Sequence, residues 1–150
     1  MTDPTDSPGQ WHPYCLIDVV LDVAMSLHQM RILLVEDDTV LREVFTLLLR
    51  EVGAEVTATG SGREAVELAA WRDFDVLLSD LGLPDMPGDV LIRRILATAR
   101  RRTRVVAMTG YPEPYLTRAR QAGAEAVFEK PVEWTSIREW LEHPGLAASA

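Results

Sequence analysis

The stretch RILLVEDDTVLREVF, residues 31–45, places a short apolar run directly before a cluster of acids. Residues 32–35 are all apolar, and Glu36, Asp37 and Asp38 follow them without a gap. An apolar run of this length is typical of a strand that is buried on both faces. Because carboxylates a few ångströms apart repel one another, three of them at the end of a buried strand indicate a binding role.

The rest of the chain repeats the alternation of a short apolar run with a helical segment. The predicted strands are ILLVE, EVTATG, DVLLSD, RVVAMTG and AVFEKP. The helical segments that follow them are TVLREVFTLLLREVG, SGREAVELAAWR, DVLIRRILATAR, PEPYLTRARQAG and TSIREWLEH. Apolar strands that alternate with helices predict a parallel sheet covered on both faces, which is a doubly wound α/β domain.

Local signals mark several ends of these segments. Gly53 is expected to cap the end of the first helix, and Ser61 with Glu64 matches the capping-box pattern at the start of the second. Gly88, which follows two prolines, is interpreted as a turn residue with unusual backbone angles. Trp71 is expected to pack at a helix end, and Trp140 to be partly buried.

Composition limits the classes of function. At 150 residues, one domain is the default, and a net charge of -8 argues against a nucleic-acid partner. The arginine-rich run at residues 100–104 is interpreted as a solvated helix end. No segment is long and apolar enough to predict a membrane span, and the residues before the N-terminal apolar stretch are acidic rather than basic, which argues against a signal peptide. The single cysteine, Cys15, excludes an intrachain disulfide and favours a cytoplasmic location.

Residues 1–29 are predicted to be a polar tail followed by a helix, residues 30–143 the main domain, and residues 144–150 a short tail. Within PYCLIDVVLDVAMSLHQ, apolar residues recur at helical spacing. Three interpretations stay open: the helix packs over the domain, it forms a homodimer seam, or Met30 is the true start of the chain. The apolar residues of this pattern are Leu16, Val20, Val23 and Leu27.

Polar side chains follow four of the predicted strands. In an open α/β sheet, ligands bind beyond the carboxyl ends of the strands, so these side chains are expected to share one site. Oxygen ligands without thiolates or histidines suit Mg²⁺, and a lysine beside them suits a phosphoryl group. Asp80, on the central strand, is the expected nucleophile that forms an aspartyl phosphate. The residues are Glu36, Asp37, Asp80, Thr109 and Lys130.

These motifs, LLVEDD, LLSDLGLPDMPG, VVAMTG and FEKP, resemble those of a response-regulator receiver domain of two-component signalling. The resemblance extends over residues 30–142. It implies a flavodoxin-like (βα)5 fold with a five-stranded sheet in the order 2-1-3-4-5, here with an extra N-terminal helix. It also implies Mg²⁺ as the cofactor and a histidine kinase or phosphotransfer protein as the partner.

Carried over by position, the resemblance makes Asp80 the phosphoacceptor, with Thr109 and Lys130 binding the phosphoryl oxygens. Glu36, Asp37 and Asp80 are the implied metal-binding carboxylates, joined by the backbone carbonyl of Gly82. Asp38 is assigned to the start of the first helix as a cap. A cis bond is expected before Pro131, and Gly110 is small enough to leave the phosphoryl group accessible.

One position departs from the family pattern. Receivers often have an aromatic switch residue three positions before the lysine, but here that position is Val127. Phe128 is adjacent, and strand alternation points it to the opposite face of the sheet. The departure therefore argues against the usual coupling of a threonine shift to an aromatic rotation, and Tyr111 or Tyr115 is the alternative signalling residue on that surface.

The sequence therefore favours a phosphoacceptor domain that signals by protein contact, through the fourth helix, fifth strand and fifth helix of the receiver. Its only expected enzymatic activity is its own phosphorylation and dephosphorylation. Two alternatives remain: a receiver-like binding module that works without phosphorylation, and the receiver fragment of a hybrid histidine kinase. A haloacid-dehalogenase-like hydrolase is disfavoured because Asp80 is followed by LGLP rather than by the pattern DxDxT.

Overall fold

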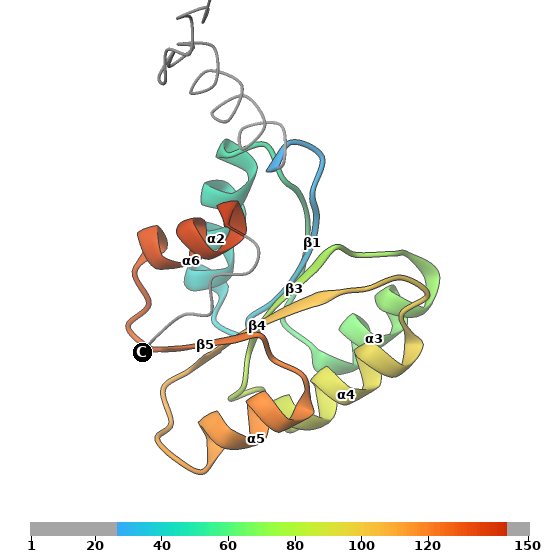
Figure 1. Ribbon diagram of the computed structural model, residues 1–150, viewed down its shortest axis with the longest axis vertical. Helices are drawn as coiled ribbons and strands as arrows, with labels where there is room; N and C mark the ends of the chain where they lie inside the picture. The colour runs from blue at the N-terminus through green and yellow to red at the C-terminus, as the bar shows by residue number, and fades with distance from the viewer. Residues whose placement is uncertain (1–26, 144–150) are drawn as a thin grey trace, which may run out of the picture.

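The computed structural model describes residues 27–143, and Figure 1 shows their arrangement. Five parallel strands form one sheet in the order β2-β1-β3-β4-β5, which confirms the predicted fold class. The strands are β1 (Arg31–Val35), β2 (Glu55–Thr59), β3 (Val76–Asp80), β4 (Arg104–Thr109) and β5 (Ala126–Glu129). The helices are α2 (Thr39–Glu51), α3 (Gly62–Trp71), α4 (Gly88–Thr98), α5 (Tyr115–Ala122) and α6 (Trp134–Glu142).

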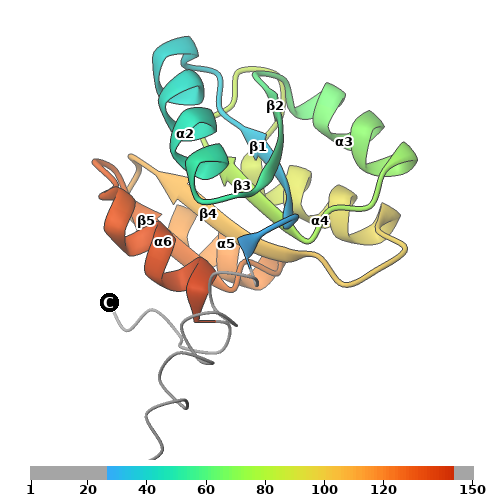
Figure 2. The same ribbon diagram turned by 90° about the horizontal axis from the view of Figure 1, so that it is seen from above.

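Helices cover both faces of the sheet, as Figure 2 shows from above. One face packs against α3, α4 and α5, and its buried cluster includes Leu33, Leu77 and Ala107. The other face packs against α2 and α6, and its cluster includes Ile32 and Leu78. The central strands are almost inaccessible on both faces, which is the physical reason for their unbroken apolar sequence.

The helix ends follow the predicted caps in part. The Asp38 carboxylate accepts a hydrogen bond from the Leu41 N–H (2.9 Å), so Asp38 is the N-cap of α2 as predicted. Gly53, just beyond the end of that helix, has φ of +95° and donates to the Arg50 carbonyl (3.0 Å). Glycine reaches this left-handed conformation without the strain that a side chain causes, as expected of a helix-ending glycine.

The predicted capping box at the start of α3 is only half right. The Ser61 hydroxyl accepts from the Glu64 N–H (3.3 Å), but the Glu64 carboxylate binds the Thr59 hydroxyl instead of returning to Ser61. The Ser61 N–H donates to the Thr59 hydroxyl (3.1 Å). A residue of the preceding strand therefore replaces the glutamate in one of the two capping bonds.

Three other expectations need correction. Trp71 stands at the end of α3 but is 84% exposed, so its ring does not pack at the helix end as predicted. Trp140 is 5% exposed rather than partly buried, since it packs under the Arg104 guanidinium, which lies 3.8 Å from the ring centroid. Gly88 does not have a positive φ; a Cβ there would lie 2.5 Å from the Leu81 Cα, so close packing explains the glycine.

Most of the predicted N-terminal helix and the whole C-terminal tail lie outside the described residues. Leu27, the last residue of the N-terminal apolar pattern, is 3% exposed and packs in the cluster of α2 and α6. It therefore contributes to the core of its own domain and is not free to join a homodimer seam. Between residues 27 and 143, no helix has both the length and the apolarity to cross a bilayer.

Candidate functional site

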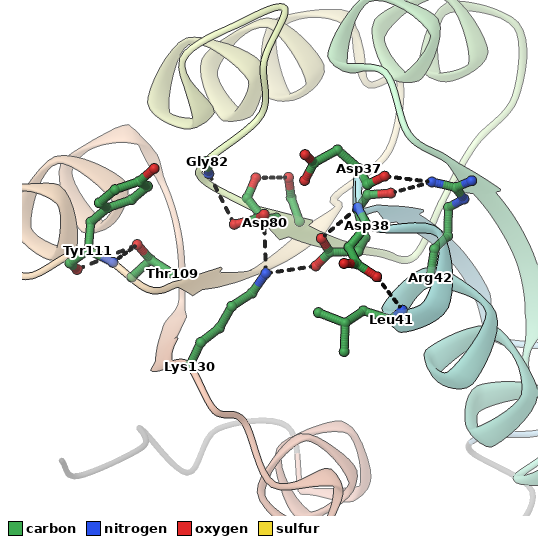
Figure 3. Close-up of polar contacts among 11 residues, drawn as sticks. Asp37, Asp38, Leu41, Arg42, Asp80, Gly82, Thr109, Tyr111 and Lys130 are labelled. Atoms are coloured by element: carbon green, nitrogen blue, oxygen red, sulfur yellow. Dashed lines mark hydrogen bonds and ion pairs between the residues drawn. The ribbon is translucent and has the colours of Figure 1, made fainter.

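The site lies at the carboxyl edge of the sheet, where the sequence places the acids. Glu36 and Asp37 follow β1, and Asp80 is the last residue of β3. β1 and β3 are adjacent, with Val35 paired to Ser79, so the two strand ends stand side by side. Each of the three acids offers a carboxylate oxygen within 4.8 Å of the others. Figure 3 shows Asp37 and Asp80 facing a common space.

Lys130 enters this group from the loop after β5. Its Nζ lies 2.9 Å from the Glu36 Oε2 and 3.2 Å from the Asp80 Oδ2, as the dashed lines in Figure 3 mark. The Glu36 side chain is 1% exposed and that of Asp80 9%, so water screens these contacts poorly. The lysine thus provides the positive charge that two buried carboxylates need.

Ionisation in the site reflects this balance. Burial raises the pKa of Glu36 above its ordinary value, and the nearby Asp80 charge acts in the same direction, whereas the hydrogen bond from Lys130 opposes both. Burial by itself lowers the pKa of Lys130. The hydrogen bond to Glu36 and the charges of both acids outweigh that effect and raise the pKa of the lysine. Lys130 is therefore held as a cation.

Backbone groups fix the orientation of Asp80 and Glu36. The Gly82 N–H donates to the Asp80 Oδ1 (3.0 Å), so both Asp80 oxygens have a partner. The Asp38 N–H donates to the Glu36 Oε1 (3.2 Å). A carboxylate with both oxygens engaged is held in a single orientation, which is a requirement for a nucleophile.

Thr109 occupies the end of β4 and is fully buried. Its hydroxyl accepts from the Tyr111 N–H (3.0 Å) and lies 3.5 Å from the Tyr111 carbonyl oxygen. In Figure 3 these bonds run toward the Tyr111 backbone, away from Asp80. The threonine is therefore at the predicted strand end, but its hydroxyl bonds the following loop rather than a carboxylate.

The residues around Lys130 match two expectations from the family resemblance. The peptide bond between Lys130 and Pro131 is cis. Val127 packs with the cluster on the side of α3, α4 and α5, whereas Phe128 packs with the cluster on the side of α2 and α6. The aromatic ring therefore points to the opposite face of the sheet, as strand alternation predicts.

Sequence reasoning missed Arg42 as a residue that supports the acidic loop. Its Nη1 donates to the backbone carbonyls of Glu36 (2.8 Å) and Asp37 (3.3 Å). Gly60 makes room for this arrangement, because a Cβ at that position would lie 2.8 Å from the same nitrogen. The sequence signal was weak, since an arginine in the first helical turns is common on solvated surfaces.

Asp85 and Tyr111 also contact the loop that follows Asp80. The Asp85 carboxylate accepts from the Ser61 hydroxyl and from the N–H groups of Gly62 and Arg63, at 3.0–3.1 Å, which ties the loop after β3 to the start of α3. These bonds, led by that from Arg63, hold the pKa of Asp85 below its ordinary value. The Tyr111 ring lies against Gly82, with Cε2 3.0 Å from where a Cβ would stand.

A parallel sheet in this order, with three acids and a lysine at its carboxyl edge, defines a receiver-type α/β domain. The family model described as the response regulator receiver domain matches residues 32–142. The chain therefore belongs to the response-regulator receiver domain family, the protein family of two-component signalling.

Curated relatives match over part of their length. The cell cycle transcriptional regulator CtrA of Caulobacter vibrioides is 41% identical over 85 residues, which cover 56% of this chain and 36% of the relative. The cell cycle response regulator CtrA of Brucella ovis is 35% identical over 81 residues, covering 54% of this chain and 34% of that protein. This chain thus spans about a third of the length of each of these relatives.

Solved structures match more completely. A CheY-like response regulator receiver domain from Methylobacillus flagellatus is 27% identical with a TM-score of 0.70, and the match covers 76% of this chain and 97% of that one. The receiver domain of a sensor histidine kinase from Pseudomonas aeruginosa is 31% identical with a TM-score of 0.69, covering 76% and 95%. That structure has a magnesium ion coordinated in its active-site cleft.

Proposed function

We propose that this chain accepts a phosphoryl group on Asp80 from the phosphohistidine of a histidine kinase or phosphotransfer protein, and that it signals by protein contact. The observation that carries the proposal is the meeting of Glu36, Asp37, Asp80 and Lys130 at one sheet edge. A helix-capping role explains each acid alone, but it does not explain a lysine bonded to two buried carboxylates from different strands.

Magnesium fits the donor set. The three acids provide the oxygen ligands that Mg²⁺ prefers, and they include no sulfur or imidazole ligand. The family resemblance adds the backbone carbonyl of Gly82 to the proposed ligand set. A bound Mg²⁺ would supply positive charge that reduces repulsion between the carboxylates and a phosphoryl group. The magnesium ion in the Pseudomonas aeruginosa receiver domain supports this assignment.

In the proposed reaction, an Asp80 carboxylate oxygen attacks phosphorus. The new P–O bond forms as the P–N bond of the phosphohistidine breaks, and the electron pair of that bond stays on the imidazole. Lys130, whose Nζ already lies 3.2 Å from Asp80, neutralises a phosphoryl oxygen. On phosphorylation, the Thr109 hydroxyl releases its hydrogen bond with the Tyr111 backbone and donates one to a phosphoryl oxygen instead. This exchange couples phosphorylation to the position of the loop after β4.

The experiment is phosphorylation of the full chain by acetyl phosphate, followed by intact mass. We expect Mg²⁺-dependent addition of one phosphoryl group that Asp80→Asn abolishes, with an unchanged circular dichroism spectrum. The matched control is Asp89→Asn, which neutralises a partly exposed acid of α4 that is paired to Arg93. Addition to Asp80→Asn at the rate of the unsubstituted chain would contradict the proposal.

Two observations favour a second candidate, a binding module that works without phosphorylation. Val127 stands where receivers often have the aromatic switch residue, and the Thr109 hydroxyl is bonded to Tyr111. Such a module has no need of the metal. Titration with Mg²⁺ by calorimetry distinguishes the two candidates, because only the phosphoacceptor requires binding at millimolar concentration or better.

Output and cellular context extend the same proposal. The contact surface is assigned to α5, β5 and α6, where the Tyr111 and Tyr115 rings pack against each other with centroids 5.2 Å apart and are 52% and 44% exposed. The proposed location is the cytoplasm. A phosphotransfer profile against the host's kinases identifies the proteins that donate phosphate to this receiver.

A further inference from the structure

Asp37 differs from the other two acids of the site in how its carboxylate is held. Both carboxylate oxygens of Glu36 and both of Asp80 have a hydrogen-bond or ion-pair partner. Asp37 is exposed, and no hydrogen bond or ion pair within residues 27–143 engages its carboxylate. The position of this carboxylate therefore depends on the backbone of the loop between β1 and α2, residues 36–38.

Arg42 bonds the backbone of this loop rather than its carboxylates. Its Nη1 donates to the carbonyl oxygens of Glu36 (2.8 Å) and Asp37 (3.3 Å), as the dashed lines in Figure 3 mark. A helical side chain leans toward the N-terminus of its helix, so Arg42, one turn into α2, reaches back over the loop. Hydrogen bonds from a guanidinium are stronger than those between neutral groups. Because the guanidinium takes the carbonyls, the Asp37 carboxylate stays free for a cation.

Gly60 leaves the space that the guanidinium occupies. It follows the last residue of β2, Thr59, whose carbonyl accepts from the Glu36 N–H (3.0 Å). A Cβ at Gly60 would lie 2.8 Å from the Arg42 Nη1, closer than side-chain carbons come to non-bonded atoms. The φ of Gly60 is not positive, so alanine fits its backbone without strain. An alanine there therefore displaces the flexible end of the arginine and leaves the backbone in place.

We propose that Arg42 is a positioning residue for the magnesium site: it fixes the backbone that presents Asp37, and Gly60 is the glycine that this contact requires. This role rests on the proposed function, in which Glu36, Asp37 and Asp80 hold Mg²⁺. A ligand that is already ordered binds more tightly than one that must be ordered on binding, because less conformational entropy is lost. Groups that orient the ligands of a metal typically change its affinity about 10–100-fold.

The sign of the effect separates positioning from simple electrostatics. Arg42 places a positive charge beside a site for a divalent cation, so charge alone predicts that removing it strengthens Mg²⁺ binding. Loss of the hold on Asp37 predicts the reverse. A variant that removes the charge therefore distinguishes the two explanations by the direction in which the affinity changes.

Titration of the full chain with Mg²⁺ by calorimetry tests this role. We expect the dissociation constant to rise about tenfold in Arg42→Met. Gly60→Ala keeps the charge but displaces the guanidinium, so we expect a similar rise, again about tenfold. The double variant should bind no more weakly than Arg42→Met, because both changes remove the same contact.

The matched control is Arg50→Met, on the same helix. Arg50 also donates to a backbone carbonyl, that of Val56 (3.4 Å), but it stands in the last turn of α2. Eight residues of helix separate it from Arg42, which is about 12 Å and beyond the Debye length at physiological ionic strength. We therefore expect Arg50→Met to change the dissociation constant by less than about twofold.

Two results of the titration overturn the proposal. One is unchanged or tighter Mg²⁺ binding by Arg42→Met, since charge then outweighs any positioning. The other is a double variant whose loss of affinity equals the product of the two single losses, because independent effects combine in that way. Urea unfolding of each variant in EDTA shows that the compared proteins are folded.

A second measurement needs neither metal nor phosphate. Relaxation of ¹⁵N in EDTA reports the order of the Asp37 and Asp38 N–H groups. We expect order parameters of about 0.85, a rigid backbone, in the unsubstituted chain, and values below about 0.6 in Arg42→Met and Gly60→Ala. Equal order parameters overturn the proposal. If the unsubstituted chain binds no Mg²⁺, the proposed function fails, and the order parameters by themselves decide whether Arg42 holds the loop.

Discussion

Replacing Lys130 by methionine tests the electrostatics of the site without the chemistry. The replacement keeps the length and apolar stem of the side chain but removes the charge that lies 2.9 Å from Glu36 and 3.2 Å from Asp80. Because Glu36 and Asp80 are buried, their mutual repulsion is then poorly screened. Without Mg²⁺, the Lys130→Met variant is therefore expected to be less stable than the unsubstituted chain.

The magnitude follows from the burial of the partners. Removing one member of a buried ion pair costs about 3–5 kcal/mol. The Lys130 side chain is 24% exposed and Glu36, whose pKa is already raised, can take up a proton instead, so the loss is expected to fall below that range. We expect the free energy of unfolding in EDTA to decrease by about 2 kcal/mol at neutral pH.

The loss is expected to depend on pH. The pKa of Glu36 is raised from its ordinary 4.5, mainly by burial, and removal of the Lys130 hydrogen bond raises it further. The folded chain then holds the Glu36 proton more tightly than the unfolded chain, a contribution that is complete below pH 4.5 and lost as pH rises through the folded pKa. The two proteins should therefore differ less near pH 5 than near pH 7.5.

Urea unfolding at both pH values, in EDTA and in millimolar Mg²⁺, checks the reasoning. The proposed binding of Mg²⁺ to the folded state is expected to return most of the lost stability. The control is Arg93→Met, which removes an exposed pair on α4 and is expected to change the free energy of unfolding by less than about 0.5 kcal/mol. If Lys130→Met unfolds in EDTA at the same urea concentration as the unsubstituted chain at neutral pH, the lysine does not balance the acids and the reasoning is wrong.

Two further predictions concern the frame of the domain. Arg31 binds Asp75 through its backbone N–H (2.8 Å) and its guanidinium (3.2 Å); burial by itself raises the pKa of Asp75, but these bonds outweigh burial and lower it. Because the pair is half exposed, Asp75→Asn should reduce the free energy of unfolding by about 1 kcal/mol at neutral pH. Urea unfolding should show this difference vanish as the pH falls through the lowered pKa of Asp75. Gly88→Ala should reduce the free energy of unfolding by about 2 kcal/mol, because a Cβ there would lie 2.5 Å from the Leu81 Cα. Gly110→Ala is the control, since a Cβ there would meet nothing within 4 Å and should leave the thermal midpoint unchanged. Equal thermal midpoints for the two variants would contradict the packing argument.

The order of elements and the class of fold could be predicted from the sequence. Unbroken apolar runs predict strands that are buried on both faces, and the helical spacing between them predicts helices that cover the sheet. Both patterns arise from local backbone geometry, so they can be read from the sequence. The location of Glu36, Asp80 and Lys130 at one edge followed from the same source, since parallel strands end on the same side of their sheet. Asp38 as a helix cap is likewise a local property.

The tertiary structure decided which partner each side chain has. Glu64 fits a capping box by spacing, yet its carboxylate goes to Thr59; Thr109 stands at the right strand end, yet its hydroxyl bonds Tyr111; and Trp71 is exposed where packing was expected. Spacing along the chain fixes the edge or face on which a residue lies. Its hydrogen-bond partner and its exposure depend on groups that folding brings together from distant parts of the sequence, and these compete with the local partners that a sequence pattern can show.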